Sequence, residues 1–381
     1  MQNYISQTHE FGVGCFHFGL KDGIEQGVNS SEYLSAVREL LGSFPEVEDL
    51  RCSYESSQTP KSFPNTPHCS IEEGGSPYPY LLLPSGIQFR LRLTQDRQAK
   101  IFPMLSRSRT GCGAEAYLVT INSPFYYPVA FVESLKAPAG WRPSAGVGIV
   151  RNYLRDAVNK NESSKIRFEC LGPSPFHADF YIRTSSDVEA GAVEHEREAK
   201  KGYDRFVFTV NPVSVVEDAS MVAELVYRNI QDELSLYYAC KALQISVSRE
   251  WKQIQKLVDE AIGQYTEIGL KGYLHRLARA HKPAQKAIVA IVKLKSSEIE
   301  AQMKRDRMYE SVYKVKAIDY PFEAINKDLV NNNPIFPTIH AYDLLKMFGE
   351  NRMKHLEILA VTLSALLGGV VGALLTKFFG N

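Results

Sequence analysis

The stretch LEILAVTLSALLGGVVGALLTKFFGN, Leu356 to Asn381, decides the organisation that we expect for the whole chain. Its part from Ile358 to Leu375 carries no charge, and Thr362 and Ser364 are its polar side chains. At about 1.5 Å per residue, this part is roughly 27 Å long as a helix, close to the thickness of a bilayer's hydrocarbon core. A buried core helix is the alternative, but the sequence favours a single transmembrane helix over residues 356–377.

Basic residues lie mainly before this segment. Arg352, Lys354 and His355 precede it, and Lys377 follows it. Because basic flanks tend to remain in the cytoplasm, we expect a single-pass protein of the cell inner membrane with its N-terminal body in the cytoplasm. The stretch from Met1 to Leu20 has neither the basic start nor the long apolar core of a secretory signal, which agrees with this orientation.

Small and polar residues share one side of the terminal helix. At about 100° per residue, Glu357, Val361, Ser364, Gly368 and Gly372 fall within one arc. Small residues four apart let membrane helices approach closely, which predicts self-association. Two interpretations stay open: a dimerising anchor, or a homo-oligomer of about four copies around a pore with Glu357 as an acidic ring that favours cations.

The first part of the chain alternates β-type and helical runs, which predicts an α+β soluble head over residues 1–212. Period-two runs of aromatic and β-branched residues predict strands. These runs are GIQFRLRL (86–93), AYLVTI (116–121), YYPVAFVE (126–133), KIRFECL (165–171), FHADFYI (176–182) and DRFVFTV (204–210). Helical spacing predicts helices over Ser31–Phe44 and Ala145–Lys160.

The composition changes after the head. Ala219 to Tyr265 contains no proline and repeats apolar residues at helical spacing, and a second helical stretch continues to about Lys316. We therefore expect a long helical stalk or bundle over residues 213–320. Residues 321–355 are expected to form a linker and a juxtamembrane helix, whose apolar side chains suit the membrane interface.

Known catalytic and metal-binding motifs are missing from the sequence. There is no GxGxxG, GxxxxGK[ST], HExxH or GxSxG, and the six cysteines form no CxxC pair. The best catalytic candidate is His177, two residues before Asp179, although a half-exposed strand with one hydrogen-bonded histidine explains this pair better. Cys112 lies between glycines without an identifiable partner. We therefore expect no enzyme, cofactor or metal.

Two basic regions are candidates for ligand binding. Lys271 to Lys316 holds 12 Lys and Arg against 4 Asp and Glu, and includes Lys271, Arg276 and Arg279. A solvated face near anionic lipid and a nucleic-acid contact both explain this block. In the head, the alternation of QFRLRL places Arg90 and Arg92 on one face of a strand.

Aromatic residues occur near this strand in the sequence. Tyr126, Tyr127 and Trp141 could stack on bases, and Arg142 could contact phosphate. Such residues are also common in ordinary sheets, so this interpretation has a structural alternative. As a binding surface, the pattern suits a nucleotide or a single-stranded nucleic acid.

The order of head, basic stalk (Lys271 to Lys316) and glycine-bearing helix (LSALLGGVVGALL, residues 363–375) resembles the membrane channel effector of Hailong-type bacterial antiphage defence systems. This resemblance concerns the layout. It implies that a DNA oligomer made by a partner nucleotidyltransferase binds the head and holds the channel closed. We thus expect a tail-anchored, ligand-gated ion channel in antiphage defence. The alternative is a membrane-tethered adaptor whose terminal helix only localises or dimerises the head.

Overall fold

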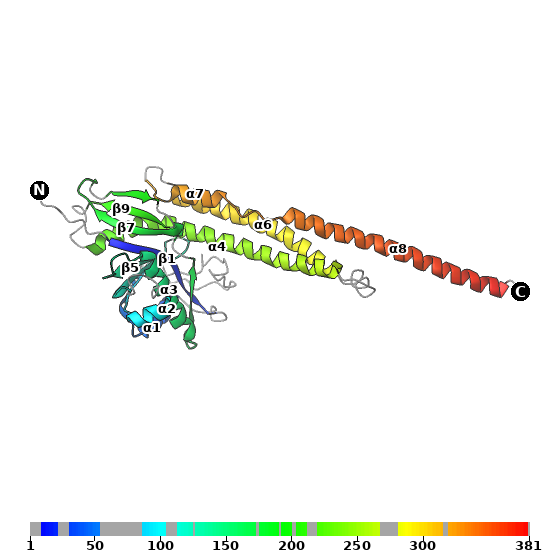
Figure 1. Ribbon diagram of the computed structural model, residues 1–381, viewed down its shortest axis with the longest axis horizontal. Coiled ribbons are helices and arrows are strands. Elements are labelled where there is room, and N and C mark those ends of the chain that lie inside the picture. Colours follow the sequence, from blue (N-terminus) through cyan, green and yellow to red (C-terminus); the bar gives the residue numbers. More distant parts are fainter. Residues whose placement is uncertain are drawn as a thin grey trace. The chain divides into compact units, whose positions relative to one another are not determined.

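The computed structural model (Figure 1) describes residues 9–21, 30–53, 86–103, 113–124, 126–172, 175–189, 192–199, 203–211, 219–266, 281–314 and 319–379. In the last helix, side chains are described as far as Leu367, apart from Arg352 and His355. The chain forms two compact units. We call residues 1–245 with 304–332 the sheet unit, and residues 246–303 with 333–381 the helical unit. A mixed α+β region followed by helices is therefore confirmed.

Over the described residues, the sheet unit is built on a mixed sheet of nine strands in the order β2-β3-β4-β5-β1-β7-β9-β8, with β6 paired to β1. The pairs are antiparallel except for β7 with β9, which is parallel. The strands are β1 His9–Leu20, β2 Val47–Ser53, β3 Gly86–Leu91, β4 Ala116–Asn122, β5 Val129–Leu135, β6 Ile166–Leu171, β7 Ala178–Thr184, β8 Val193–Glu198 and β9 Asp204–Val210.

Helices cover both faces of this sheet (Figure 1). On one face lie α1 (Ser30–Gly42), α2 (Gln95–Ile101) and α3 (Pro143–Lys160), over a core that includes Phe16, Phe18 and Phe168. On the other face, the first part of α4 (Ala219–Thr266) packs on aromatic residues of β1, β5, β7 and β9. The period-two alternation of the strands supplies apolar side chains to both cores.

All six strands and both helices that were predicted for the head (residues 1–212) are present. Three strands were not predicted: β1, β2 and β8. The charge-rich segment Val193–Glu198 forms β8 at the edge of the sheet, where charged side chains are well tolerated. The central strand β1 escaped prediction because glycines interrupt its apolar pattern.

Those glycines allow α3 to pass close to β1. A Cβ on Gly12 would lie 2.5 Å from Cγ2 of Val147 and 2.6 Å from the carbonyl oxygen of Pro143. A Cβ on Gly14 would lie 2.9 Å from the other methyl group of Val147. The backbone of α3 therefore rests directly on the backbone of β1.

We expect Gly12→Ala to lower the free energy of unfolding by about 3 kcal/mol, because α3 must shift to make room for the methyl group. Gly42→Ala is the matched control, since a Cβ there has no atom within 4 Å. This control should be neutral or slightly stabilising, because alanine favours helix. Denaturant unfolding followed by circular dichroism measures both. Equal stability of the two variants would contradict the close approach.

The helical unit contains the second part of α4, most of α6 (His281–Val312) and α8 (Thr338–Phe379). Ring contacts join them: Tyr265 of α4 stacks on Phe348 of α8 at 4.1 Å, and Trp251 lies 5.6 Å from Phe336. Buried residues of α6 follow the three-and-four spacing of packed helices: Ala284, Ala287, Ile291, Leu294 and Ala301.

The predicted boundaries differ from these units. The predicted stalk began at residue 213, whereas the first part of α4 packs on the sheet through Val226, Ile230 and Leu234. The segment with α7 (Glu323–Asn331), predicted as part of a linker, also belongs to the sheet unit because Phe322 enters its core. The predicted juxtamembrane helix is not separate, since α8 continues from Thr338 to Phe379.

Candidate functional site

The predicted basic strip on β3 is balanced by acids of β2. Phe89 and Leu91, which alternate with the two arginines, are buried. Nη1 of Arg90 lies 3.3 Å from a carboxylate oxygen of Asp49, and Nε of Arg92 lies 3.3 Å from a carboxylate oxygen of Glu48. Each arginine therefore has its own acidic partner on β2, and the two do not form a strip of uncompensated positive charge.

The tyrosines predicted to stack on bases have a packing role. Tyr127 is 4% exposed and lies in the sheet core, and Tyr126 packs beside it. Their backbone amides donate to the hydroxyl of Ser235 in α4, at 3.2 and 2.8 Å. Trp141 is also buried and donates to Ser134. A stacking role for Tyr127 is thus wrong, because its ring is not accessible.

Arg142, in contrast, lies in a patch of arginines and tyrosines that the sequence did not reveal as a unit. Its guanidinium lies 5.5 Å from the ring centre of Tyr203, and that of Arg205 lies 4.2 Å from the ring centre of Tyr181. We call these four residues the arginine–tyrosine patch. Asp179 links them, because it is opposite Arg205 in the β7–β9 pair and accepts from the amide of Ser144, two residues after Arg142.

The patch has mixed charge. Glu198 lies 3.7 Å from Arg205, and Glu10 is paired with Tyr181 between β1 and β7. Burial raises the pKa of Glu10 and of Asp179 above their usual values. The positive charge of Arg205 offsets only part of each rise. Stacked guanidinium groups can contact bases and phosphates. Period-two alternation in FHADFYI and DRFVFTV places these residues on one face, but the parallel pairing of β7 with β9 is not readable from the sequence.

Asp179 caps the first turn of α3. Its Oδ1 accepts from the Ser144 amide at 2.9 Å in the first turn of α3, an interaction that stabilises a helix N-terminus. The side chain of His177 and all of Cys112 lie outside the described residues. Among the described residues, no group of three His, Cys, Asp or Glu could hold a metal ion.

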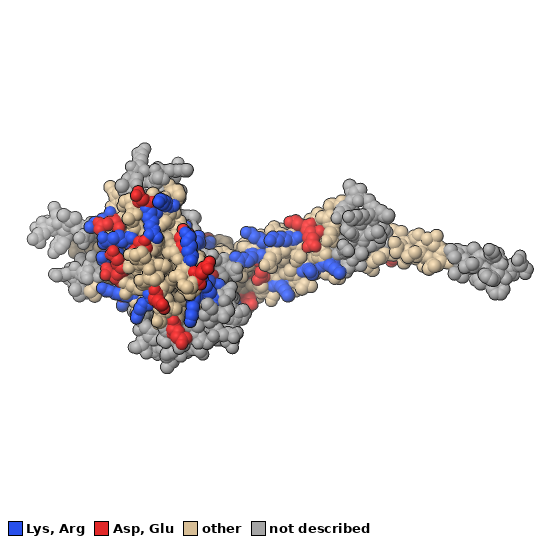
Figure 2. Space-filling view, turned by 90° about the horizontal axis from the view of Figure 1, so that it is seen from below, with Lys and Arg blue, Asp and Glu red and all other residues tan. Residues whose placement is uncertain are grey.

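The remaining basic candidates are Lys271, Arg276 and Arg279, which lie outside the described residues. Farther along the basic block, Arg305 is 3% exposed, so this block is not one solvated face. Figure 2 shows Lys and Arg interspersed with Asp and Glu on the visible face of the sheet unit. Neither observation supports a broad single-sign surface in the part of the chain that is described.

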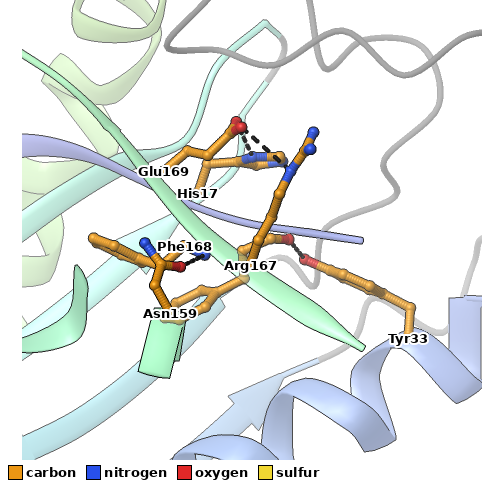
Figure 3. A network of polar contacts seen from close by, with 7 residues as sticks. His17, Tyr33, Asn159, Arg167, Phe168 and Glu169 are labelled. Carbon is orange, nitrogen blue, oxygen red and sulfur yellow. Dashed lines mark hydrogen bonds and ion pairs between the residues drawn. The ribbon is translucent and has the colours of Figure 1, made fainter. Parts of the chain in front are cut away.

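A buried charged network lies on β1 and β6 (Figure 3). Nδ1 of His17 is 3.6 Å from Glu169, and Nε of Arg167 is 3.2 Å from the same carboxylate. Tyr33 of α1 donates to the carbonyl of Phe18 nearby. His17 is fully buried, and neither of its ring nitrogens makes a hydrogen bond within the described residues. Without access for a substrate, we assign these residues a structural role.

A second buried network fastens α4 to the chain before α7. Glu233 of α4 is 1% exposed, and one of its oxygens accepts from the Tyr313 hydroxyl and the Phe322 amide, both at 2.9 Å. Asn326 donates to Tyr313 at 2.8 Å and to the carbonyl of Glu233 at 3.0 Å. We call these four residues the Glu233 network. Burial raises the pKa of Glu233 to about 8.

On α8, the predicted pore or contact face is exposed as far as it is described. Glu357, Val361 and Ser364 are exposed, whereas the exposure of Gly368 and Gly372 lies outside what the structure describes. Over the described residues, none of the helices is both long and apolar enough to cross a membrane. The residues of the predicted span after Leu367 lie outside the part of the chain whose side chains are described.

Comparison of the chain with protein-family models, with curated proteins and with solved structures gives no match.

Proposed function

We propose that this protein is a tail-anchored, self-associating membrane effector whose sheet unit controls a pore made by its terminal helices. The supporting observation is the continuity of α8 from Thr338 to Phe379. Its first part is packed in the helical unit, where Leu345 and Phe348 are buried. The same helix then continues into the apolar segment, so a movement of the helical unit reaches that segment without an intervening loop.

The exposed apolar residues of α8 favour an environment other than water. Val361 is 68% exposed and Leu367 is 65% exposed, and their neighbours Ile358, Leu363 and Leu366 are at least half exposed. Leaving apolar surface in water costs about 25 cal/mol per Å². Contiguous exposed apolar surface is typical of protein or membrane contacts. A bilayer that surrounds several copies of this helix removes this apolar surface from water through contacts with lipid and with the neighbouring helices.

The signal that we propose is a nucleotide or a nucleic acid bound by the sheet unit. The arginine–tyrosine patch supports this choice, because the guanidinium of Arg142 is exposed and that of Arg205 is partly exposed, so both can contact phosphates or bases, whereas Tyr181 is buried beneath Arg205. The resemblance in layout to the Hailong effector favours a DNA oligomer supplied by a partner nucleotidyltransferase. A ligand that binds the closed oligomer more tightly than the open one holds the pore shut.

Ion efflux tests this proposal. The full chain is inserted into liposomes together with a short single-stranded DNA, and efflux is recorded before and after nuclease treatment. We expect efflux after nuclease and little before it. No efflux in either condition, with insertion confirmed, would favour the tethered adaptor. Equal efflux before and after nuclease treatment would support a pore but would contradict control by a nucleic acid.

Glu357→Gln tests which residues line the pore. We expect the preference for cations over anions to fall several-fold, because a ring of carboxylates at the mouth is removed. Glu224→Gln is the control, since it removes an exposed carboxylate from α4, outside α8, where Glu224 lies 2.6 Å from Arg228. Reversal potentials in a salt gradient measure the preference. An unchanged preference in Glu357→Gln would place this residue outside the pore.

A further inference from the structure

A second apolar stripe runs along α6, away from the residues that pack within the helical unit. Val289, Val292, Ile299 and Met303 are 55%, 63%, 64% and 50% exposed. With Ser296 between them, these positions repeat at spacings of three and four. This spacing is typical of the contact seam of a coiled coil. Because the packed face of α6 is already buried through Ala287, Ile291 and Leu294, the outer stripe requires a different partner.

We propose that the outer stripe of α6 is a seam at which two copies of this chain pack side by side with their α6 helices parallel. The parallel direction rests on the proposed function, because copies anchored in one bilayer by their terminal helices point the same way. Val289, Ser296 and Met303 then occupy one set of core positions, and Val292 and Ile299 occupy the other. Four exposed apolar side chains per copy are thereby covered.

The charges that flank the stripe complement each other in this arrangement. Lys295 immediately precedes a core position, and Glu300 immediately follows one. In a parallel two-helix coil, a residue preceding the core faces the residue five positions farther along in its partner. Lys295 therefore faces Glu300 of the second copy. In its own chain, Lys295 lies 2.8 Å from Glu298 in an exposed pair, and such pairs contribute little, so the exchange costs little.

Cysteine cross-linking of the full chain in liposomes tests the seam. Val292→Cys and Ile299→Cys should form disulfide-linked dimers rapidly on mild oxidation. Ser297→Cys is the control, because Ser297 is partly exposed on the same helix but lies roughly 120° around it from the middle of the stripe. The unsubstituted chain corrects for the native cysteines. Cross-linking no faster at the stripe than at Ser297→Cys would overturn the seam.

Charge exchange tests its direction. In the Ile299→Cys background, Lys295→Glu and Glu300→Lys should each slow dimer formation several-fold, and the double exchange should restore it. No restoration would overturn the parallel register. Efflux from the same liposomes separates this inference from the proposed function. Efflux without stripe cross-links refutes the seam but keeps the channel, whereas stripe cross-links without efflux keep the seam and refute the channel.

Discussion

Leu363→Arg combined with Leu366→Arg should release the protein from membranes. An arginine near the centre of a membrane helix costs about 3 kcal/mol, and each lost leucine removes about 0.5 kcal/mol of favourable insertion. The double variant therefore loses roughly 7 kcal/mol, which is several orders of magnitude in the inserted fraction. Resistance to extraction at alkaline pH, followed by blotting, measures insertion. Efflux should be lost together with it.

Because these two leucines are exposed, their replacement should change membrane insertion without changing the fold of the chain. Leu363 and Leu366 are 50% and 61% exposed, so their replacement removes no buried contact within the chain. The fluorescence of the two buried tryptophans, Trp141 in the sheet unit and Trp251 in the helical unit, should remain that of the native protein. Leu363→Ile with Leu366→Ile is the control for the positions themselves. A double arginine variant that resists extraction as well as this control does would rule out a span.

The fold could be predicted where one residue pattern dominates a segment. The strands with uninterrupted alternation, such as β3, β4 and β9, were found, and so was the helical character of α4 and α6. The central strand β1 could not be found, because Gly12 and Gly14 are there for the close approach of α3. That requirement comes from a helix more than 100 residues later, and a local pattern does not contain it.

The candidate sites were less predictable because they depend on pairing between distant segments. The charges of Arg90 and Arg92 are readable, but their acidic partners on β2 follow from strand pairing. Likewise, Tyr127 could be recognised as aromatic, while its burial under Ser235 depends on the position of α4. In α6 the packed and outer stripes are both apolar, so spacing alone did not separate them.

Glu233→Gln should stabilise the sheet unit and flatten its dependence on pH. The pKa of Glu233 rises from an ordinary value of 4.5 to about 8, first because of burial and further because Glu323 and Asp319 are nearby. Between these two pH values, the unfolded chain gives up this proton while the folded chain retains it. Folding therefore binds a proton, and the free energy of unfolding falls as pH rises, by up to about 1.4 kcal/mol per pH unit.

Glutamine keeps the geometry of the network. Its carbonyl oxygen can accept from the Tyr313 hydroxyl and the Phe322 amide, as the carboxyl oxygen does. Between pH 5 and 8, we expect the wild-type protein to lose on the order of 3 kcal/mol more than the variant. Thermal unfolding in one detergent at a series of pH values, followed by near-ultraviolet circular dichroism, measures this difference.

Glu224→Gln supplies the comparison, because Glu224 lies on the same helix in an exposed pair with Arg228, 2.6 Å away. It removes the same charge without touching the Glu233 network, so its pH profile should follow that of the wild-type protein. The loss of stability at high pH also predicts where the structure loosens first. Phe322 enters the sheet core beside Phe176 and Phe206, and its amide should exchange with solvent faster above pH 8. Parallel pH profiles for Glu233→Gln and Glu224→Gln would show that Glu233 is already ionised in the folded protein.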